Sequence, residues 1–159
     1  MPAQVSPPPA ASRAVPIIEM LKGREGPLLP ILHAIQEEFG FVPPETLPLI
    51  AEALNISRAD VHGVVTFYHD YREKPAGRHV LKVCRAEACQ SMGGDQIAAS
   101  LQTLLGVKFH ETAKDGSVTL EPVYCLGLCA CAPAAMLDGA VIGRLDASKL
   151  NDIAEQVRA

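Results

Sequence analysis

Tryptophan is absent from the 159 residues of this sequence, and aromatic residues of every kind make up only 4% of it. The core must therefore consist mostly of aliphatic side chains, for which a hydrophobic content of 48% is sufficient. Apolar runs such as "GPLLPIL" and "HGVV" are far shorter than the about 20 residues that a membrane-spanning helix needs, so no membrane insertion is expected. An excess of positive charge is also absent, since 14 basic residues face 18 acidic ones and the formal net charge is -4. A nucleic acid is therefore not expected as a partner.

Signals for export are missing as well. The stretch "MPAQVSPPPAASRAVP" has neither a basic start nor a continuous apolar segment, so it lacks the features of a secretory signal. We therefore expect a cytoplasmic protein, in which cysteines serve metals or catalysis more often than disulfides. The odd number of cysteines, five, agrees with this expectation.

The first half of the sequence has the apolar spacing of helices. Residues 1–15 are rich in Pro and Ala and are predicted to form a disordered tail. Between residues 16 and 76, "LLPILHAIQEEFG" and "PPETLPLIAEALN" repeat apolar residues at three- and four-residue steps, and "SRAD" is a variant of the capping box. A small helical bundle is predicted there, ending in the charged link "DYREKPAG".

The pattern changes over residues 77–159. "HVLKVC" alternates like a strand, "GGDQIAASLQTLLG" has helical spacing, and "AKDG" and "LDGA" mark the turns of two hairpins. "DASKLNDIAEQVRA" is predicted as a closing helix with Asp146 as its cap. The order strand, helix, hairpin, hairpin, helix predicts a compact α/β unit of about thioredoxin size, and an α+β class for the whole chain.

All five cysteines lie in this second unit, in two groups. Cys84 and Cys89 form C-x4-C after the first strand, and Cys125, Cys129 and Cys131 form C-x3-C-x-C after a hairpin strand. Each group is predicted to occupy a loop at a strand end, where α/β units usually place their chemistry. If the two strand ends are neighbours in one sheet, four sulfurs can converge on one point.

The spacing leaves several uses of these cysteines open. Buried structural thiols have no reason to occur in pairs, and the C-x2-C of a thioredoxin-type redox pair is absent. The plant-type ferredoxin spacing is absent too. Four thiolates can hold either a structural zinc ion or a [2Fe-2S] cluster, and spacing separates these two poorly. A thiol redox enzyme that uses Cys129 and Cys131 as a C-x-C pair is a third possibility.

The glycines near the cysteines favour the cluster somewhat. A [2Fe-2S] core with four thiolates is anionic and is stabilised by backbone N–H donors. Gly93, Gly94 and Gly127 can supply such donors, because two precede a helix and one lies inside the second cysteine pair. Arg85 and Gln90 are expected to be solvated surface residues.

Three longer stretches carry a family resemblance. "VCRAEACQSMGG", "CLGLCACAPAAML" and the preceding "VHGVVTFYHDYREKPAGRHVLKVC" resemble the small thioredoxin-like [2Fe-2S] subunits of respiratory NADH dehydrogenase, NAD-reducing hydrogenases and NAD-dependent formate dehydrogenases. The resemblance implies that Cys84, Cys89, Cys125 and Cys129 ligate the cluster, with one pair on each iron. It implies that Cys131, at a variable position of the pattern, is a buried thiol and not a ligand.

The resemblance also implies a role in a complex. The sequence has no G-x-G-x-x-G after a strand, no P-loop and no hydrolase triad, so it is not expected to bind nicotinamide or flavin alone. Its compactness is most similar to the gamma subunit of cytosolic NAD-dependent formate dehydrogenases. The expected partners are then a flavin- and NAD-binding subunit and a larger molybdenum- and iron-sulfur-containing catalytic subunit. The helical bundle, with "TFY" near its end, would either dock a partner or use Phe67 and Tyr68 to pack the two halves together.

Overall fold

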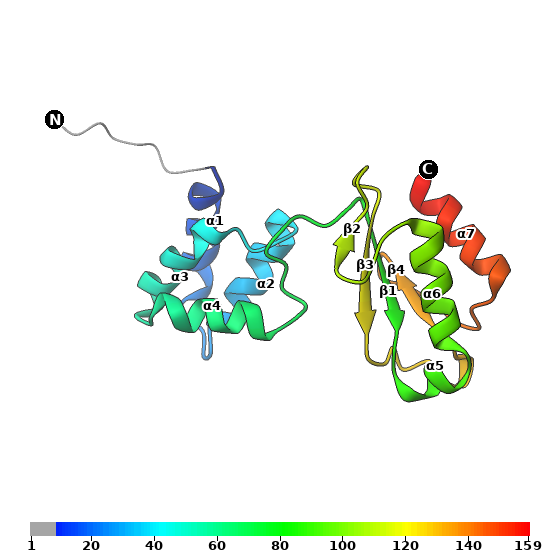
Figure 1. Ribbon diagram of the computed structural model, residues 1–159. Helices are drawn as coiled ribbons and strands as arrows, with labels where there is room; N and C mark the ends of the chain where they lie inside the picture. Colours follow the sequence, from blue (N-terminus) through cyan, green and yellow to red (C-terminus); the bar gives the residue numbers. More distant parts are fainter. Residues whose placement is uncertain (1–8) are drawn as a thin grey trace. The chain divides into compact units, whose positions relative to one another are not determined.

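The computed structural model describes residues 9–159, which divide after Pro75 into a helical unit and a sheet-containing unit (Figure 1). Sequence reasoning divided the chain after residue 76. The fold as a whole is α+β, with a helical first half and a second half of strands and helices.

The first helix, α1 (Pro9–Leu21), begins inside the segment predicted to be disordered. The prediction of a disordered tail over residues 1–15 is therefore wrong for residues 9–15, while residues 1–8 lie outside the described part of the chain. Ala11 and Ala14 are both buried, and Ala14 joins Ile18 in the core of the unit. Alanine has the highest helix propensity of all residues and fits close helix contacts, so an Ala-rich segment can become an ordered helix when a core accepts it.

The other helices of the first unit follow the predicted pattern. They are α2 (Leu28–Phe39), the 3-10 turn η1 (Pro44–Thr46), α3 (Leu47–Leu54) and α4 (Arg58–Phe67). Gly40 and Asn55 end α2 and α3 in the left-handed conformation, and Ser57 with Asp60 forms a reciprocal capping box before α4. The predicted stops and starts are thus the ones used. The core is mostly aliphatic, as expected from the composition.

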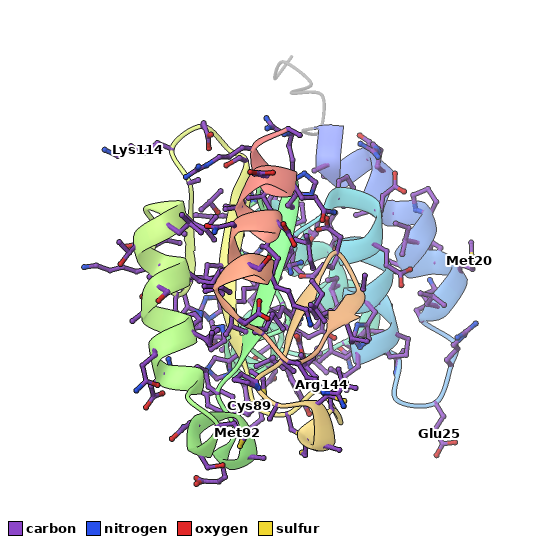
Figure 2. All side chains as sticks on the ribbon, turned by 90° about the vertical axis from the view of Figure 1, so that its right-hand side faces the viewer. Met20, Glu25, Cys89, Met92, Lys114 and Arg144 are labelled. Atoms are coloured by element: carbon purple, nitrogen blue, oxygen red, sulfur yellow. The ribbon has the colours of Figure 1, made fainter. Side chains whose placement is uncertain are left out.

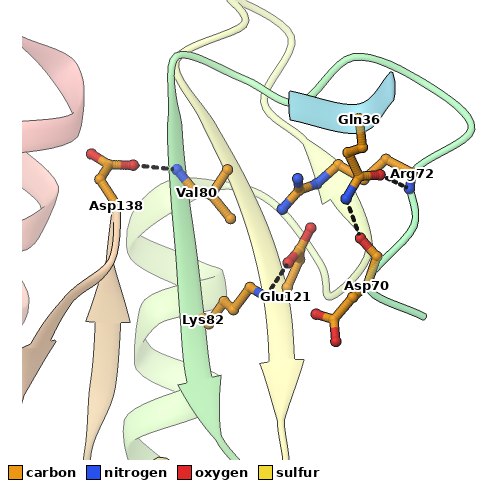
Figure 3. Close-up of polar contacts among 7 residues, drawn as sticks. All are labelled: Gln36, Asp70, Arg72, Val80, Lys82, Glu121 and Asp138. Atoms are coloured by element: carbon orange, nitrogen blue, oxygen red, sulfur yellow. Dashed lines mark hydrogen bonds and ion pairs between the residues drawn. The ribbon is translucent and has the colours of Figure 1, made fainter. Parts of the chain in front are cut away.

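Gln36 of α2 fastens the segment that follows α4. The Gln36 side chain donates to the carbonyl oxygen of Asp70 at 2.7 Å and accepts from the N–H of Arg72 at 2.7 Å (Figure 3). Both polar groups of the amide are satisfied, which fixes the path of the chain as it leaves the helical unit.

The second unit is a mixed sheet with two helices on one face (Figure 1). Its strands are β1 (His79–Cys84), β2 (Glu111–Thr112), β3 (Val118–Val123), β4 (Ala135–Leu137) and β5 (Ala140–Ile142), in the spatial order β2-β3-β1-β4-β5. The central pair, β1 and β3, is parallel and the other pairs are antiparallel. Both predicted hairpins are present.

Helices α6 (Gly94–Leu105) and α7 (Ala147–Arg158) cover this sheet. Leu101 from α6 and Ile153 and Val157 from α7 share one core with Leu81 and Leu120 of the strands. The side chain of Asp146 caps α7 by accepting from the N–H of Lys149 at 3.0 Å, as the sequence predicted. Two short elements complete the unit, α5 (Glu87–Ser91) and the 3-10 turn η2 (Cys129–Cys131), and both contain cysteines.

Candidate metal centre

The ends of the two central strands bring the cysteine-containing segments together. Strands β1 and β3 run parallel in a register that pairs Cys84 with Val123, so both end at the same edge of the sheet. The N–H of Arg85 donates to the carbonyl of Val123 at 2.7 Å, and the N–H of Cys84 donates to the carbonyl of Ala134 at 3.0 Å. Three segments, after β1, after β3 and before β4, therefore meet there. The condition for convergence of the cysteines, that the two strand ends are neighbours in one sheet, is therefore met.

Cys84 and Cys89 form the buried half of this region, each with a relative exposure of 3%. Cys89 lies on the short helix α5, whereas the sequence prediction placed it in a loop. A Cβ atom on Gly94 would lie 2.5 Å from the carbonyl oxygen of Cys89, so only glycine permits this approach of α6 to α5. The start of α6 thus packs directly against the backbone that carries Cys89.

Cys125 and Cys129 form the exposed half. Their sulfur atoms are 3.8 Å apart. Two thiolates bound to one tetrahedral metal at about 2.3 Å each are also about 3.8 Å apart, so this pair has the separation of two ligands on a single metal. Gly127, in the left-handed conformation with φ of 75°, turns its N–H toward the sulfur of Cys125 at 3.3 Å. The predicted donor role of Gly127 is therefore present in the geometry.

The backbone also surrounds the sulfur of Cys84. Burial raises the pKa of this thiol, but N–H groups of Ala86, Cys125 and Leu126, together with the thiol of Cys89, lower it by more, and its pKa lies below the ordinary value. A cysteine that is both buried and supplied with N–H donors is suited to hold a negative charge out of water. Two of these donors come from the segment after β3, so the second cysteine segment helps to stabilise a thiolate of the first.

The four sulfurs influence one another electrostatically. Burial and the neighbouring Cys84 thiol raise the pKa of Cys89, with a smaller contribution from Cys129. The hydrogen bond and charge of Cys125 raise the pKa of Cys129, with smaller contributions from burial and from Cys84. Like charges that must share a small region oppose ionisation, and a bound cation relieves that opposition. The arrangement therefore favours a positively charged metal group among the four cysteines.

Within residues 9–159, no three His, Cys, Asp or Glu side chains lie together as ligands of one metal ion. A two-iron cluster with four cysteine ligands requires two thiolates at each iron instead. Cys125 and Cys129 meet that requirement by distance, and Cys84 and Cys89 form a second, mutually interacting pair. The residues present therefore fit a [2Fe-2S] cluster.

Cys131, by contrast, faces a different set of neighbours. It is half-buried at the end of η2, where its N–H donates to the carbonyl of Leu128 at 2.8 Å. Its Cβ lies close to Gly143 of the segment after β5. The expectation of a buried thiol is thus met only in part, because Cys131 is half-buried.

Sequence reasoning missed the role of Arg85. Its guanidinium donates to Asp95 at 2.9 Å and lies over the ring of Phe109 at 5.4 Å, so it is a partnered side chain and not simply solvated surface. Gln90 also has a partner, since its side chain donates to the carbonyl of Arg85 at 2.7 Å. The contact of Arg85 with Phe109 joins segments that are distant in sequence, and no local pattern predicts it.

A thioredoxin-like sheet with paired cysteines at adjacent strand ends defines a small iron–sulfur protein of the electron-transfer class. The chain belongs to the thioredoxin-like [2Fe-2S] ferredoxin family, whose model matches residues 14–158. Its cofactor is accordingly a [2Fe-2S] cluster. The family expectation drawn from the cysteine motifs and from the "TFY" region is confirmed.

Similar proteins occur in two kinds of complex. The chain is 41% identical to a subunit of the NADH-quinone oxidoreductase of Pseudomonas aeruginosa over 107 residues, 67% of this chain and 64% of that protein. It is 31% identical to the NADP-reducing hydrogenase subunit HndA of Solidesulfovibrio fructosivorans over 149 residues, 94% of this chain and 87% of that protein. The aligned part of the Pseudomonas protein is thus less than two thirds of its length.

A solved structure shows the same fold. It is the crystal structure of an NAD+-reducing [NiFe]-hydrogenase in the H2-reduced state, one chain of which matches with a TM-score of 0.70 and 21% identity. The match covers 82% of this chain and 22% of the hydrogenase chain. At this identity the similarity establishes the fold.

Proposed function

We propose that this chain is an electron-transfer subunit in which Cys84, Cys89, Cys125 and Cys129 ligate the [2Fe-2S] cluster. The observation that carries the proposal is the meeting of the two cysteine pairs at one sheet edge, with the Cys125 and Cys129 sulfurs 3.8 Å apart. We assign Cys84 and Cys89 to one iron and Cys125 and Cys129 to the other.

The residues of the chain hold and shield the cluster. When bound, a [2Fe-2S] cluster supplies one-electron transfer. The buried pair places one side of it in an apolar environment with Ala132 and Ala134, while the exposed pair leaves the other side near the surface. Met92 and Tyr124 stand next to the two cysteine segments with exposures of 62% and 75%. Exposed apolar side chains beside a redox centre suit the close approach of a partner protein.

The partner in this proposal is a flavin- and NAD-binding subunit of an NAD-linked complex. The names of the relatives support it, since they are subunits of an NADH-quinone oxidoreductase and of an NADP-reducing hydrogenase. A formate dehydrogenase with a molybdenum-containing catalytic subunit, expected from the sequence, is one of three candidate parent complexes. No helix within residues 9–159 has the length and apolar content to cross a membrane. We propose the cytoplasm as the location, where the five thiols would remain reduced.

We further propose that the helical unit, residues 16–76 in the sequence prediction, docks the chain into its complex. Phe67 at the end of α4 is 73% exposed and contacts Tyr68 edge-to-face. Met20 on α1 is 77% exposed. These side chains lie outside the core of the helical unit, so a partner could bury them without disturbing the packing of that core.

Spectroscopy of the cysteine variants tests the ligand assignment. The chain is purified without oxygen, and its visible absorption and paramagnetic resonance spectra are recorded before and after reduction with dithionite. Serine at Cys84, Cys89, Cys125 or Cys129 is expected to abolish or distort both spectra. Cys131→Ser is the matched control and is expected to leave them unchanged.

Two results would overturn the proposal. A colourless protein that holds one zinc ion would establish a four-cysteine zinc module instead. Loss of the cluster in Cys131→Ser alone would show that the ligand set is wrong. The parent complex is identified separately, by purifying the tagged chain with its bound subunits and comparing reduction of NAD by formate or hydrogen with oxidation of NADH by a quinone.

A further inference from the structure

The segment after β5 is hydrogen-bonded to the turn that carries Cys129 and to the residues that follow it. This turn, η2, ends at Cys131, and the N–H of Ala132 closes it by donating to the carbonyl of Cys129 at 3.3 Å. The N–H of Arg144 donates to the carbonyl of Cys131 at 2.6 Å, and the N–H of Leu145 donates to the carbonyl of Pro133 at 3.0 Å. Residues 143–145 therefore form a backing strap for η2.

Lys149 holds the first two residues of the backing strap, while Leu145 is buried in the core. The ammonium group of Lys149, in the first turn of α7, donates to the carbonyl of Gly143 at 2.8 Å and to the carbonyl of Arg144 at 3.1 Å. Arg144 has a positive φ of 52°, a conformation that costs a non-glycine residue energy and persists only where its surroundings enforce it. Hydrogen bonds from a charged donor are about twice as strong as neutral ones, so Lys149 is well suited to enforce this backbone.

Gly143 packs tightly against Cys131. A Cβ atom on Gly143 would lie 2.8 Å from the Cβ of Cys131 and 3.0 Å from its carbonyl oxygen. The Gly143 backbone therefore packs against Cys131 with no room for a side chain, so a displacement of the backing strap shifts Cys131 and hence η2. Cys129 is an exposed residue on a short 3-10 turn, so its own surroundings constrain it less than those of buried Cys89.

We propose that Lys149 is a positioning residue for the cluster, which fixes the sulfur of Cys129 through Gly143, Arg144 and Cys131. The inference rests on the proposed ligand role of Cys129. Lys149 does not touch the cluster in this proposal. It acts through two carbonyl groups and one backbone hydrogen bond, in the way that residues behind a metal ligand orient it.

The test compares three lysine variants in the full chain. Lys149→Met keeps the aliphatic stem and removes the donors, Lys149→Arg keeps the charge and donors, and Lys114→Met is the matched control. Lys114 lies in the β2–β3 turn, at the opposite end of the unit from Cys89 and Arg144 (Figure 2). The readouts are the rate at which visible absorption disappears in the presence of a chelator and the resonance spectrum of the reduced protein.

We expect Lys149→Met to lose its cluster about tenfold faster, the low end of the effect of residues behind metal ligands, and to show a changed resonance spectrum. Lys149→Arg is expected to restore most of the wild-type rate, and Lys114→Met to equal the wild type. Wild-type behaviour of Lys149→Met would overturn the proposal. Equal loss in Lys149→Met and Lys149→Arg would also overturn it, because the donors would then be irrelevant.

A second variant reaches the backing strap without changing Lys149. Gly143→Ala places a methyl group against Cys131 and is expected to speed cluster loss while far-UV circular dichroism remains that of the folded protein. An unchanged rate in Gly143→Ala would contradict the proposed route. The ligand assignment fails separately, if Cys129→Ser keeps the wild-type spectrum, so the two failures are distinguishable.

Discussion

At the scale of single residues, backbone conformation places the donors around the cysteines. Cys125 and Gly127 both have positive φ values, of 103° and 75°. This turn directs the Gly127 N–H at the Cys125 sulfur, and the path of the same segment brings the Cys125 and Leu126 N–H groups to Cys84. Donors of this kind stabilise thiolate charge without adding a charged side chain.

Substitution of Gly127 tests its left-handed backbone conformation while the backbone N–H that faces the Cys125 sulfur is retained. A Cβ atom at this position would meet nothing within 4 Å, so Gly127→Ala tests the left-handed backbone alone. We expect it to reduce the free energy of unfolding by about 1–2 kcal/mol, the cost of a left-handed L-residue, as measured by urea unfolding. Gly127→Asn is the control, because asparagine tolerates this conformation and should cost less. Equal stability of the Ala and Asn variants would contradict the explanation.

The placement of the two cysteine groups after strands could be predicted from sequence, whereas the residues packed behind them could not. Cys84 and Cys125 each follow a recognisable strand, and the spacing of each pair is local information. Gly94, Gly143 and Lys149 matter only because of the backbone that they meet, and no hydrophobic period predicts those contacts. His79 is a similar case, since its partner Asp138 lies 59 residues further on.

At the scale of elements, the β4–β5 hairpin is fastened to the start of β1 through Asp138 (Figure 3). One carboxylate oxygen accepts from the N–H of Val80 at 2.8 Å, and the other lies 2.6 Å from Nδ1 of His79. Burial raises the pKa of Asp138, but the bonds from His79 and Val80 lower it by more, and it lies below the ordinary value of 3.8. The ionised carboxylate is therefore the form that the folded protein stabilises.

Asp138→Asn should destabilise the sheet in a pH-dependent manner. Because the folded pKa is lowered, the contribution of the carboxylate is fully present above its unfolded value and is lost as the pH falls through the folded value. We expect the variant to lose about 1 kcal/mol at pH 7, a modest figure since the side chain is partly exposed. In urea unfolding of both proteins in the same cluster state, the two curves should converge in acid below the ordinary carboxyl pKa of 3.8.

Asp152→Asn, at an exposed position of α7, is the matched control. Its free energy of unfolding should equal that of the wild type at neutral and at acid pH. A stability difference between wild type and Asp138→Asn that stays constant into acid would mean that the charge of Asp138 contributes nothing.

The elements themselves differ in how well sequence predicts them. Ser57, Asn55 and Asp146 are local caps, and each ends or begins a helix as predicted. Residues 9–15 of helix α1 were missed because Pro and Ala composition suggests disorder, while their order comes from burial against other helices. Helix α5 was missed because five residues are too few for a hydrophobic period. The parallel pairing of β1 with β3 also depends on the long crossover between them.

At the scale of the whole molecule, each unit has its own aliphatic core. The helical unit is centred on Ile31, Leu32 and Ile35, and the sheet unit on Leu81, Leu101 and Leu120. All five cysteines belong to the sheet unit, so the proposed cluster ligands need no residue from the helical unit. Separate cores of this kind are the usual condition for separate folding.

A fragment of residues 76–159 should therefore assemble the cluster alone, since the strand ends, α5, η2 and the backing strap are all within it. We expect its visible and resonance spectra to match those of the full chain, with the Cys129→Ser fragment as the cluster-free control.

The proposed docking role of the helical unit predicts a different result for assembly. The fragment should bring down less of the flavin-binding partner than the full chain does, because it lacks Met20 and Phe67. Undiminished recovery of that partner would place the docking surface on the sheet unit, whereas a fragment that folds without acquiring the cluster would show that the helical unit takes part in holding it.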